Sequence, residues 1–320
     1  MLNKQLLFII LFLYLPFSLA SEKPLIRLGV LAFGTVNWEL TALTDEGGLE
    51  TAEFNLQIQK LANPQAGKIA LQSGAVDMIV SDWIWVSLLR TRGEDFTFYP
   101  YSSTSGALMV SADSGIKNLR DLSNKKLGIA GGELDKNWLL LQASAQQQSL
   151  DINNQVTKIY AAPPLLNQQL LNSRVDAIIT YWHFAARLEA EGYQQLLDGK
   201  MVLKSLGIHE IVPSLGYVFR ESWGNQHKKA VNSFLKLTAM AKAKLCTEDS
   251  AWKKIIPLTK TKDTHTQIKL RQRYCAGQIE HWGAAEKQAA EKIYQLFRKL
   301  SHNKLTGDSE NLQTGTFWAL

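Results

Sequence analysis

Cysteine, proline and glycine are all scarce in this sequence: 320 residues contain two, eight and 21 of them. This scarcity excludes a disulfide-rich scaffold, collagen and low-complexity disorder. After residue 20 no apolar run approaches the ~20 residues that a membrane-spanning helix needs. The six histidines form no i,i+4 pair and no HExxH motif, so we expect no metal site and no other cofactor. No G-x-S-x-G or GxxxxGK[ST] motif is present, so neither a serine hydrolase nor an ATPase is indicated.

The first twenty residues have the pattern of a secretory signal peptide. Lys4 precedes an apolar stretch from Leu6 to Leu15, and Ser18-Leu19-Ala20 supplies small residues before a cut at Ser21. An uncleaved anchor is the alternative. We therefore expect residues 1–20 to be removed and the protein to be periplasmic.

Export also bears on the two cysteines. Cys246 and Cys275 are expected to form one disulfide in an oxidising compartment, with two buried free thiols as the alternative.

A long internal repeat indicates two similar lobes. Two blocks recur in the same order about 99 residues apart, which is too long for a solenoid unit. The first block pairs Leu28-Gly29-Val30 and Asn37-Trp38 with Leu127-Gly128-Ile129 and Asn137-Trp138; the second pairs Val76-Asp77 and Trp83 with Val175-Asp176 and Trp182.

Each copy predicts an α/β lobe with a parallel sheet, because strand-like and helix-like segments alternate. The expected strands are 26–30, 54–58 and 76–81 in the first copy, and 127–130, 156–160 and 175–180 in the second. Asn37 and Asn63 are expected to cap helices, and further helices are expected at 135–148 and 163–172. Extended segments at 96–106 and 211–220 are interpreted as strands that cross between the lobes. The first lobe is therefore predicted to comprise 21–104 plus 214–320, and the second 105–213.

The carboxyl ends of the predicted strands suggest a ligand site, because open α/β sheets bind ligands there. Four tryptophans fall at equivalent strand exits, and we expect them to wall an interlobe cleft; core packing is the alternative. Asp82 is the expected polar anchor. Since no arginine lies beside these tryptophans, a neutral or cationic group is favoured over a small inorganic anion. The candidate ligand-binding residues are Trp38, Ser81, Asp82, Trp83, Ser105, Gly132, Glu133, Asn137, Trp138, Tyr181 and Trp182.

Basic residues are concentrated near the C-terminus. Residues 224–304 hold 17 Lys and Arg against six Asp and Glu, on segments with helical apolar spacing. A solvated helix surface is the simple interpretation, and a docking surface is the alternative. Without interleaved aromatic and basic residues, binding to nucleic acid is not expected.

Several motifs resemble the solute-binding proteins of ABC importers. The resemblance covers about residues 25–220 and is to the branch for nitrate, sulfonates, taurine and the pyrimidine precursor of thiamine. Asn124 stands where that family usually has glycine. The matching segments are Gly47-Gly48-Leu49, Ala70 to Asp77, its copy at 170–177, and Ser111 to Ile129.

The resemblance implies a type II periplasmic-binding-protein fold: two α/β lobes joined by a two-strand hinge. It also implies a monomeric, non-enzymatic protein that closes on a small organic molecule, aromatic, heterocyclic or organosulfur, and docks on an inner-membrane ABC permease. The alternatives are a solute receptor for a sensor or periplasmic partner, or an exported enzyme on the same fold.

Overall fold

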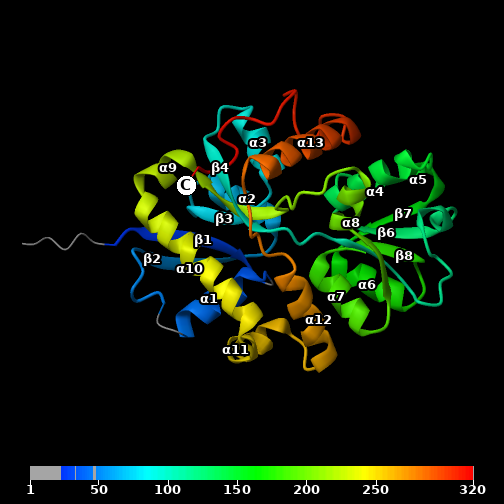
Figure 1. The fold of residues 1–320 in the computed structure, drawn as a ribbon, viewed down its shortest axis with the longest axis horizontal. Coiled ribbons are helices and arrows are strands. Elements are labelled where there is room, and N and C mark those ends of the chain that lie inside the picture. Colours follow the sequence, from blue (N-terminus) through cyan, green and yellow to red (C-terminus); the bar gives the residue numbers. More distant parts are fainter. Residues whose placement is uncertain (1–22, 33, 46–47, 320) are drawn as a thin grey trace, which may run out of the picture.

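A computed structural model describes residues 23–32, 34–45 and 48–319, which form two α/β lobes side by side (Figure 1). The predicted signal peptide lies outside the described residues. Each lobe contains one five-stranded sheet, with strand orders β2-β1-β3-β10-β4 and β7-β6-β8-β5-β9. The first three strands of each order, β2-β1-β3 and β7-β6-β8, correspond to the strands predicted for the two copies of the internal repeat, so the predicted duplication is visible in the topology.

The first sheet is mixed rather than wholly parallel. Strands β2, β1 and β3 run parallel, as their alternation with helices predicts, whereas β10 is antiparallel to both β3 and β4. The fourth strand reverses because it is a return strand from the other lobe and not part of a βαβ unit. The strands are β1 (Leu25–Leu31), β2 (Asn55–Leu61), β3 (Met78–Ser81), β4 (Phe96–Ser102) and β10 (Leu215–Arg220).

The second sheet repeats this arrangement, with β5 antiparallel to β8 and β9. The edge strand β9 is an addition to the predicted elements. The strands are β5 (Ala107–Val110), β6 (Lys126–Ala130), β7 (Thr157–Ala161), β8 (Ala177–Thr180) and β9 (Gln194–Asp198).

Helices cover both faces of each sheet. Asn63 caps α2 as predicted, because its side chain accepts the Ala66 N–H and Pro64 fills the first helical position. Asn37 does not cap α1: the helix begins one residue earlier, and the Asn37 amide donates to the carbonyls of Leu31 and Gly34. Asn124 has a φ of 60°, which asparagine tolerates better than most residues and which explains the usual glycine at that position. These helices are α1 (Val36–Asp45), α2 (Pro64–Gln72), α3 (Trp83–Arg90), the 3-10 helix η1 (Leu119–Leu122), α4 (Lys136–Gln147), α5 (Ile152–Gln155), α6 (Pro163–Leu171), α7 (Trp182–Ala190), α8 (Gly199–Ser205) and α9 (Glu221–Gln226).

The C-terminal helices connect the two lobes. Helices α10 (Lys228–Thr247) and α11 (Asp249–Thr259) pack on α1, whereas α12 (Thr264–Cys275) packs on α7 and α13 (Ala284–Leu300) packs on α4 (Figure 1). The end of α10 is joined to the end of α12 by a disulfide between Cys246 and Cys275. Most of the basic side chains of α10 are exposed, as a solvated surface predicts, but Lys242 is 6% exposed.

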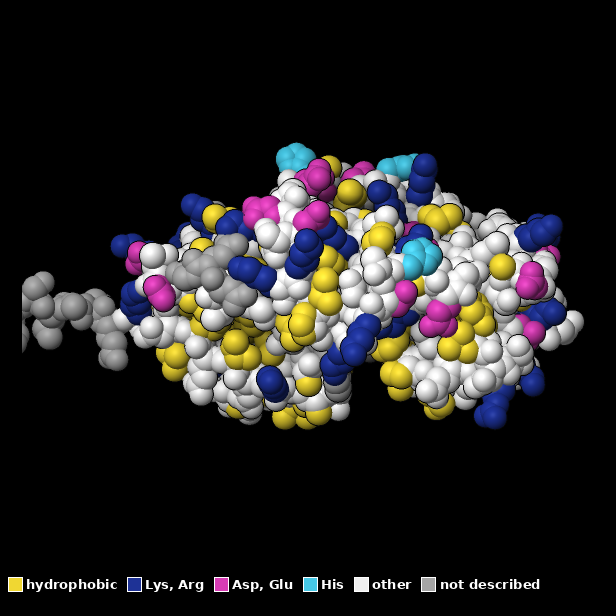
Figure 2. Space-filling model, turned by 90° about the horizontal axis from the view of Figure 1, so that it is seen from below, with side chains coloured by type: hydrophobic (Ala, Val, Ile, Leu, Met, Phe, Trp, Pro, Cys, Tyr) yellow, Lys and Arg dark blue, Asp and Glu magenta, His cyan; other side chains and the backbone are white. Residues whose placement is uncertain are grey.

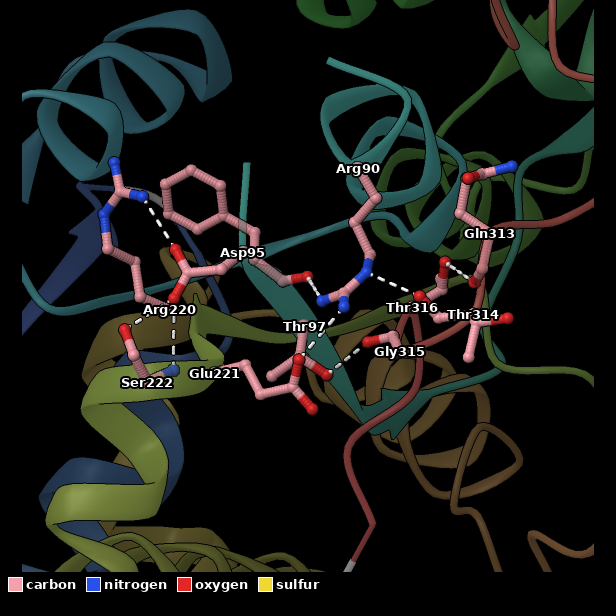
Figure 3. Close-up of polar contacts among 11 residues, drawn as sticks. Arg90, Asp95, Thr97, Arg220, Glu221, Ser222, Gln313, Thr314, Gly315 and Thr316 are labelled. Atoms are coloured by element: carbon pink, nitrogen blue, oxygen red, sulfur yellow. Dashed lines mark hydrogen bonds and ion pairs between the residues drawn. The ribbon is translucent and has the colours of Figure 1, made fainter. Parts of the chain in front are cut away.

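The C-terminal tail extends the first sheet at its edge (Figure 3). Phe98 of β4 donates its N–H to the Thr316 carbonyl, and the Trp318 N–H donates back to the Phe98 carbonyl. The Arg90 guanidinium fixes this tail: it donates to the carbonyls of Thr314 and Phe96 and pairs with Glu221 at 3.0 Å. The open edge of β4 is therefore covered by the chain itself.

Two segments carry the chain between the lobes: 103–106 after β4, and 206–214 before β10. The predicted lobe boundaries, 104/105 and 213/214, fall within these segments, and we propose them as the limits of the first and second lobes. A search of the described residues for helices long and apolar enough to cross a membrane finds none.

Candidate functional site between the lobes

Four helix N-termini follow the strand ends where the sequence predicts a site. Helices α1 and α3 follow β1 and β3 in the first lobe; α4 and α7 follow β6 and β8 in the second. Trp38 and Trp138 are the third residues of α1 and α4, and Trp83 and Trp182 are the first residues of α3 and α7. Seen from below, the surface is notched between the two lobes (Figure 2).

An ion pair joins the lobes at this edge. Asp82, directly before α3, lies 3.2 Å from the ammonium group of Lys136, the first residue of α4. The same carboxylate lies 3.7 Å from the ammonium group of Lys68 on α2. Asp82 also accepts the N–H of Trp85, which caps α3. The N-termini of two helices from different lobes therefore meet around one carboxylate.

The charges of this cluster are coupled. Burial works against ionisation of Asp82, but the charges of Lys136 and Lys68 and the Trp85 N–H outweigh it and lower the pKa of Asp82. Burial lowers the pKa of Lys68, a shift that Asp82 only partly offsets. The Lys68 ammonium lies 4.6 Å from the centre of the Trp85 ring, a cation–π distance. With Asp82 ionised, the three side chains carry a net charge of one positive unit.

This cluster corrects the expected chemistry of Asp82. The carboxylate is not a free anchor for a cation, because two lysines and one backbone N–H occupy it. Sequence analysis missed Lys68 and Lys136 because it considered only residues next to the tryptophans. For Lys136 one signal was available: it follows Asp135, which caps α4, and therefore begins a helix at the predicted edge.

The second lobe contributes a glycine turn and a partly buried acid. Gly131 and Gly132 have φ of 96° and 89°, a conformation that favours glycine, and a Cβ at Gly131 would lie 3.0 Å from an oxygen of Asp135. Asp135 caps α4 by accepting the Trp138 N–H. Burial raises the pKa of Asp135 to about 6. Glu133 is exposed.

Three of the predicted ligand-binding residues make contacts within the protein. Asn137 accepts the Gly106 N–H at 3.0 Å, and Ser105 accepts the Gly199 N–H at 3.0 Å. Both bonds tie the connecting segment 103–106 to the second lobe. Ser81 is buried at the end of β3, opposite Gly216 of β10. Tyr181 is 37% exposed, and burial together with the charge of Asp135 raises its pKa.

The four tryptophans do not form the expected open wall. Trp38 and Trp182 pack edge to face across the two lobes, at 6.2 Å between ring centres, and Trp252 and Tyr274 complete their cluster. Trp83 donates its indole N–H to the Pro213 carbonyl at 2.9 Å. Neighbouring helices cover these rings. The tryptophans therefore follow the alternative prediction, which was packing in the core. The exposed fractions of Trp38, Trp83, Trp138 and Trp182 are 5, 3, 1 and 8%.

Contacts made by α12 also span the lobes. Arg273 lies 2.6 Å from the carboxylate of Glu189 on α7. Arg187 of α7 donates to the Thr259 carbonyl at the end of α11. The disulfide therefore joins α10, in the first lobe, to α12, which contacts the second lobe through Arg273. Among the described residues, no group of three or more His, Cys, Asp and Glu side chains is placed to hold a metal ion.

Two α/β lobes with mixed sheets of this order, facing helix N-termini and two connecting segments define the type II periplasmic-binding-protein fold. The aliphatic sulphonate-binding protein SsuA of Escherichia coli matches with a TM-score of 0.71 and 16% identity, over 92% of this chain and 97% of that chain. SsuA of Xanthomonas axonopodis pv. citri, bound to MOPS, matches with a TM-score of 0.68 and 15% identity, over 93% and 99%. The ligand-binding component of an ABC-type import system from Staphylococcus aureus, solved with zinc bound, matches with a TM-score of 0.65 and 16% identity, over 87% and 92%.

Sequence comparison identifies the family within this fold. Residues 44–248 match the NMT1/THI5-like family, so the chain belongs to that family. This assignment agrees with the resemblance found in the sequence motifs. A comparison with curated protein sequences finds no significant match.

Proposed function

We propose that this protein is the solute-binding component of an ABC importer and holds a small organic molecule between its lobes. The observation that carries the proposal is the meeting of α3 and α4 at Asp82 and Lys136, one residue from each lobe. A solute bound there touches both lobes at once and stabilises their closed arrangement. Family membership and the structural relatives, which are binding components of importers, support the same function.

The ligand we propose carries an anionic group, such as the sulfonate of an organosulfur compound. Lys68 and Lys136 supply two ammonium groups against one carboxylate, and both lie beside a helix N-terminus. Trp85, which lies under Lys68, offers an aromatic surface beside the charged group. We further propose a periplasmic location, a non-enzymatic role, a monomeric state and an inner-membrane permease as the partner.

Thermal stability in the presence of candidate solutes tests this function. Taurine, short alkanesulfonates and MOPS are compared with the matching amines and alcohols. Since a ligand that binds only the folded protein raises its melting temperature, the proposal predicts shifts with the sulfonates alone. A panel without any stabilising sulfonate would contradict the proposed ligand class.

One lysine substitution tests the proposed site. Lys136→Gln removes a charge-assisted hydrogen bond, so affinity for the stabilising sulfonate should fall about tenfold or more. Lys126→Gln is the control, because Lys126 is exposed and begins β6 at the end opposite Lys136. Equal affinities of the two variants, measured by calorimetry, would remove Lys136 from the site.

A further inference from the structure

A second pocket lies in the first lobe, away from the interlobe site. Its volume is about 680 Å³, within the range of small-molecule pockets. The lining residues come from β4, β10, α10, the connection between α12 and α13, the first turn of α13, and the C-terminal tail. None of these residues lies within 105–213, so the second lobe takes no part in the pocket.

Aromatic side chains form much of the wall and are held in place by other rings. Tyr101 and Tyr217 pack edge to face at 5.3 Å between ring centres. Trp282 packs against Phe317 at 4.8 Å, and Trp318 against Phe219 at 5.1 Å. Rings fixed in this way present flat apolar surface without losing rotamer freedom on binding, which suits a planar ligand.

Hydrogen-bond donors dominate the buried polar groups of the wall. Lys242 lines the pocket, and its ammonium group donates to the Tyr101 carbonyl at 2.8 Å and lies 4.2 Å from the Tyr101 ring centre. The Lys242 ammonium group has three N–H donors. In the described part of the chain, the Tyr101 carbonyl is the one acceptor that bonds to it. The buried indole N–H groups of Trp282 and Trp318 have no hydrogen-bond partner among the described residues.

The charge around the pocket favours a ligand with a negatively charged hydrogen-bond acceptor. Glu39, a buried acid whose charge acts on Lys242, has a pKa raised by burial to about 7, so it is partly protonated at neutral pH. Burial also lowers the pKa of Lys242, and a bound anion beside this ammonium group would favour its charged form. At the rim, Lys287 offsets Glu280. A planar carboxylate fits both the flat walls and the surplus of donors, whereas an amine would add a cation beside Lys242.

We propose that this pocket is a second ligand site, for a small aromatic carboxylate, on the hinge strands of the first lobe. The proposal does not depend on the function assigned to the interlobe site. Because β4 and β10 lead directly into the two connecting segments, a ligand here contacts the strands about which the lobes would move.

A heavy-atom probe locates the site without any substitution. Crystals of the protein are soaked with 4-iodobenzoate or, separately, with 4-iodobenzylamine. The proposal predicts an anomalous iodine peak between α10 and Trp318 with the carboxylate and no such peak with the amine. An iodobenzoate peak found only between the lobes or at the surface, equal peaks for both probes, or no peak at all would overturn it.

Pocket-filling variants give the solution counterpart. Ala239 and Ala243 are exposed wall residues on one face of α10, so Ala239→Trp or Ala243→Trp fills the pocket without disturbing the core. Met240→Trp is the matched control, because Met240 is 48% exposed on the same helix but does not line the pocket. Affinity for 4-iodobenzoate, measured by ligand-observed NMR, should fall at least about tenfold in the first two variants and change less than about twofold in the control. Equal affinity in all of these variants would overturn the proposal, and circular dichroism establishes that each is folded.

Discussion

At the residue scale, the most unusual side chain is Glu39, a fully buried acid on α1. It accepts hydrogen bonds from the hydroxyls of Tyr101 and Tyr274, and the charge of Lys242 acts on it. Burial raises its pKa to about 7 from an ordinary 4.5, against the lowering effects of Lys242 and the two tyrosines. The folded protein therefore holds a proton here that the unfolded chain has already released.

This proton predicts how stability depends on pH. A raised pKa of an acid means that the folded state binds more protons between about 4.5 and 7, so the contribution of Glu39 to the free energy of unfolding falls as pH rises through that range and then levels. The loss is on the order of 3 kcal/mol. Burial lowers the pKa of His183 from 6.5 to about 4, so His183 acts in the opposite direction below about pH 6.5. Glu39→Gln should remove the contribution of Glu39, most clearly above about pH 6.5, because Asp135 has a pKa of about 6 and His183 acts below about 6.5. Urea titrations across this range measure the slope, and identical slopes in both proteins would show that Glu39 is ionised throughout.

At the element scale, the C-terminal tail depends on one glycine. Gly315 has a φ of 80°, and a Cβ there would collide with the guanidinium of Arg90, which fixes the tail. Gly315→Ala should lower the free energy of unfolding by about 2–3 kcal/mol, from backbone strain and displacement of Arg90. Gly207→Ala is the control, since Gly207 has a φ of 78° and open space around its Cβ position. If the two alanine variants unfold at the same urea concentration, Arg90 adjusts freely and the tail is not fixed by it.

The disulfide is the covalent element that holds α10 to α12. Cys246 and Cys275 are 29 residues apart, and closing a loop of that length stabilises the folded state by about 3–4 kcal/mol in the chain-entropy model. Cys246→Ala with Cys275→Ala should lose much of this stability in thermal or urea unfolding. Mass spectrometry of the alkylated, non-reduced protein should find no free thiol; two alkylated cysteines would mean that the bond does not form.

At the scale of the whole molecule, the sequence was informative wherever structure is local. The repeated strands follow from alternating apolar residues, and the start of α2 follows from Asn63-Pro64. The segments 96–106 and 211–220, which contain β4 and β10, were recognised as crossing between the lobes. The antiparallel direction of β10 was not predicted, because direction is set by the path between the lobes. The ion cluster of Asp82 was also missed, since Lys68, Asp82 and Lys136 come from three helices that meet only through tertiary packing.

The burial of the tryptophans has the same physical origin. The predicted positions of the tryptophans at four equivalent helix starts were correct, but other segments determine which side chains cover each ring. Trp38 and Trp182 are covered by each other and by α11 and α12, segments outside the repeat. A repeat predicts equivalent positions, whereas the surroundings of each position depend on residues that differ between the copies.

Lobe movement is the remaining property at this scale. If the two connecting segments act as a hinge, a bound solute stabilises the closed arrangement, and small-angle scattering should show a smaller radius of gyration with a saturating sulfonate than without it. The contacts of α12 with α7 limit how far the lobes separate, so Arg273→Ala, which removes the ion pair with Glu189, should enlarge this difference. An unchanged radius in both proteins would argue against a hinge.

The central claim is that a solute binds between the lobes, at the N-termini of α3 and α4. The most direct test is a crystal structure of the protein with the sulfonate that gives the largest thermal shift. The account predicts the sulfonate within hydrogen-bond distance of the Lys136 ammonium group, with other ligand atoms in contact with the first lobe near Asp82 and Trp85. A ligand held wholly by one lobe, away from Lys136, would contradict it.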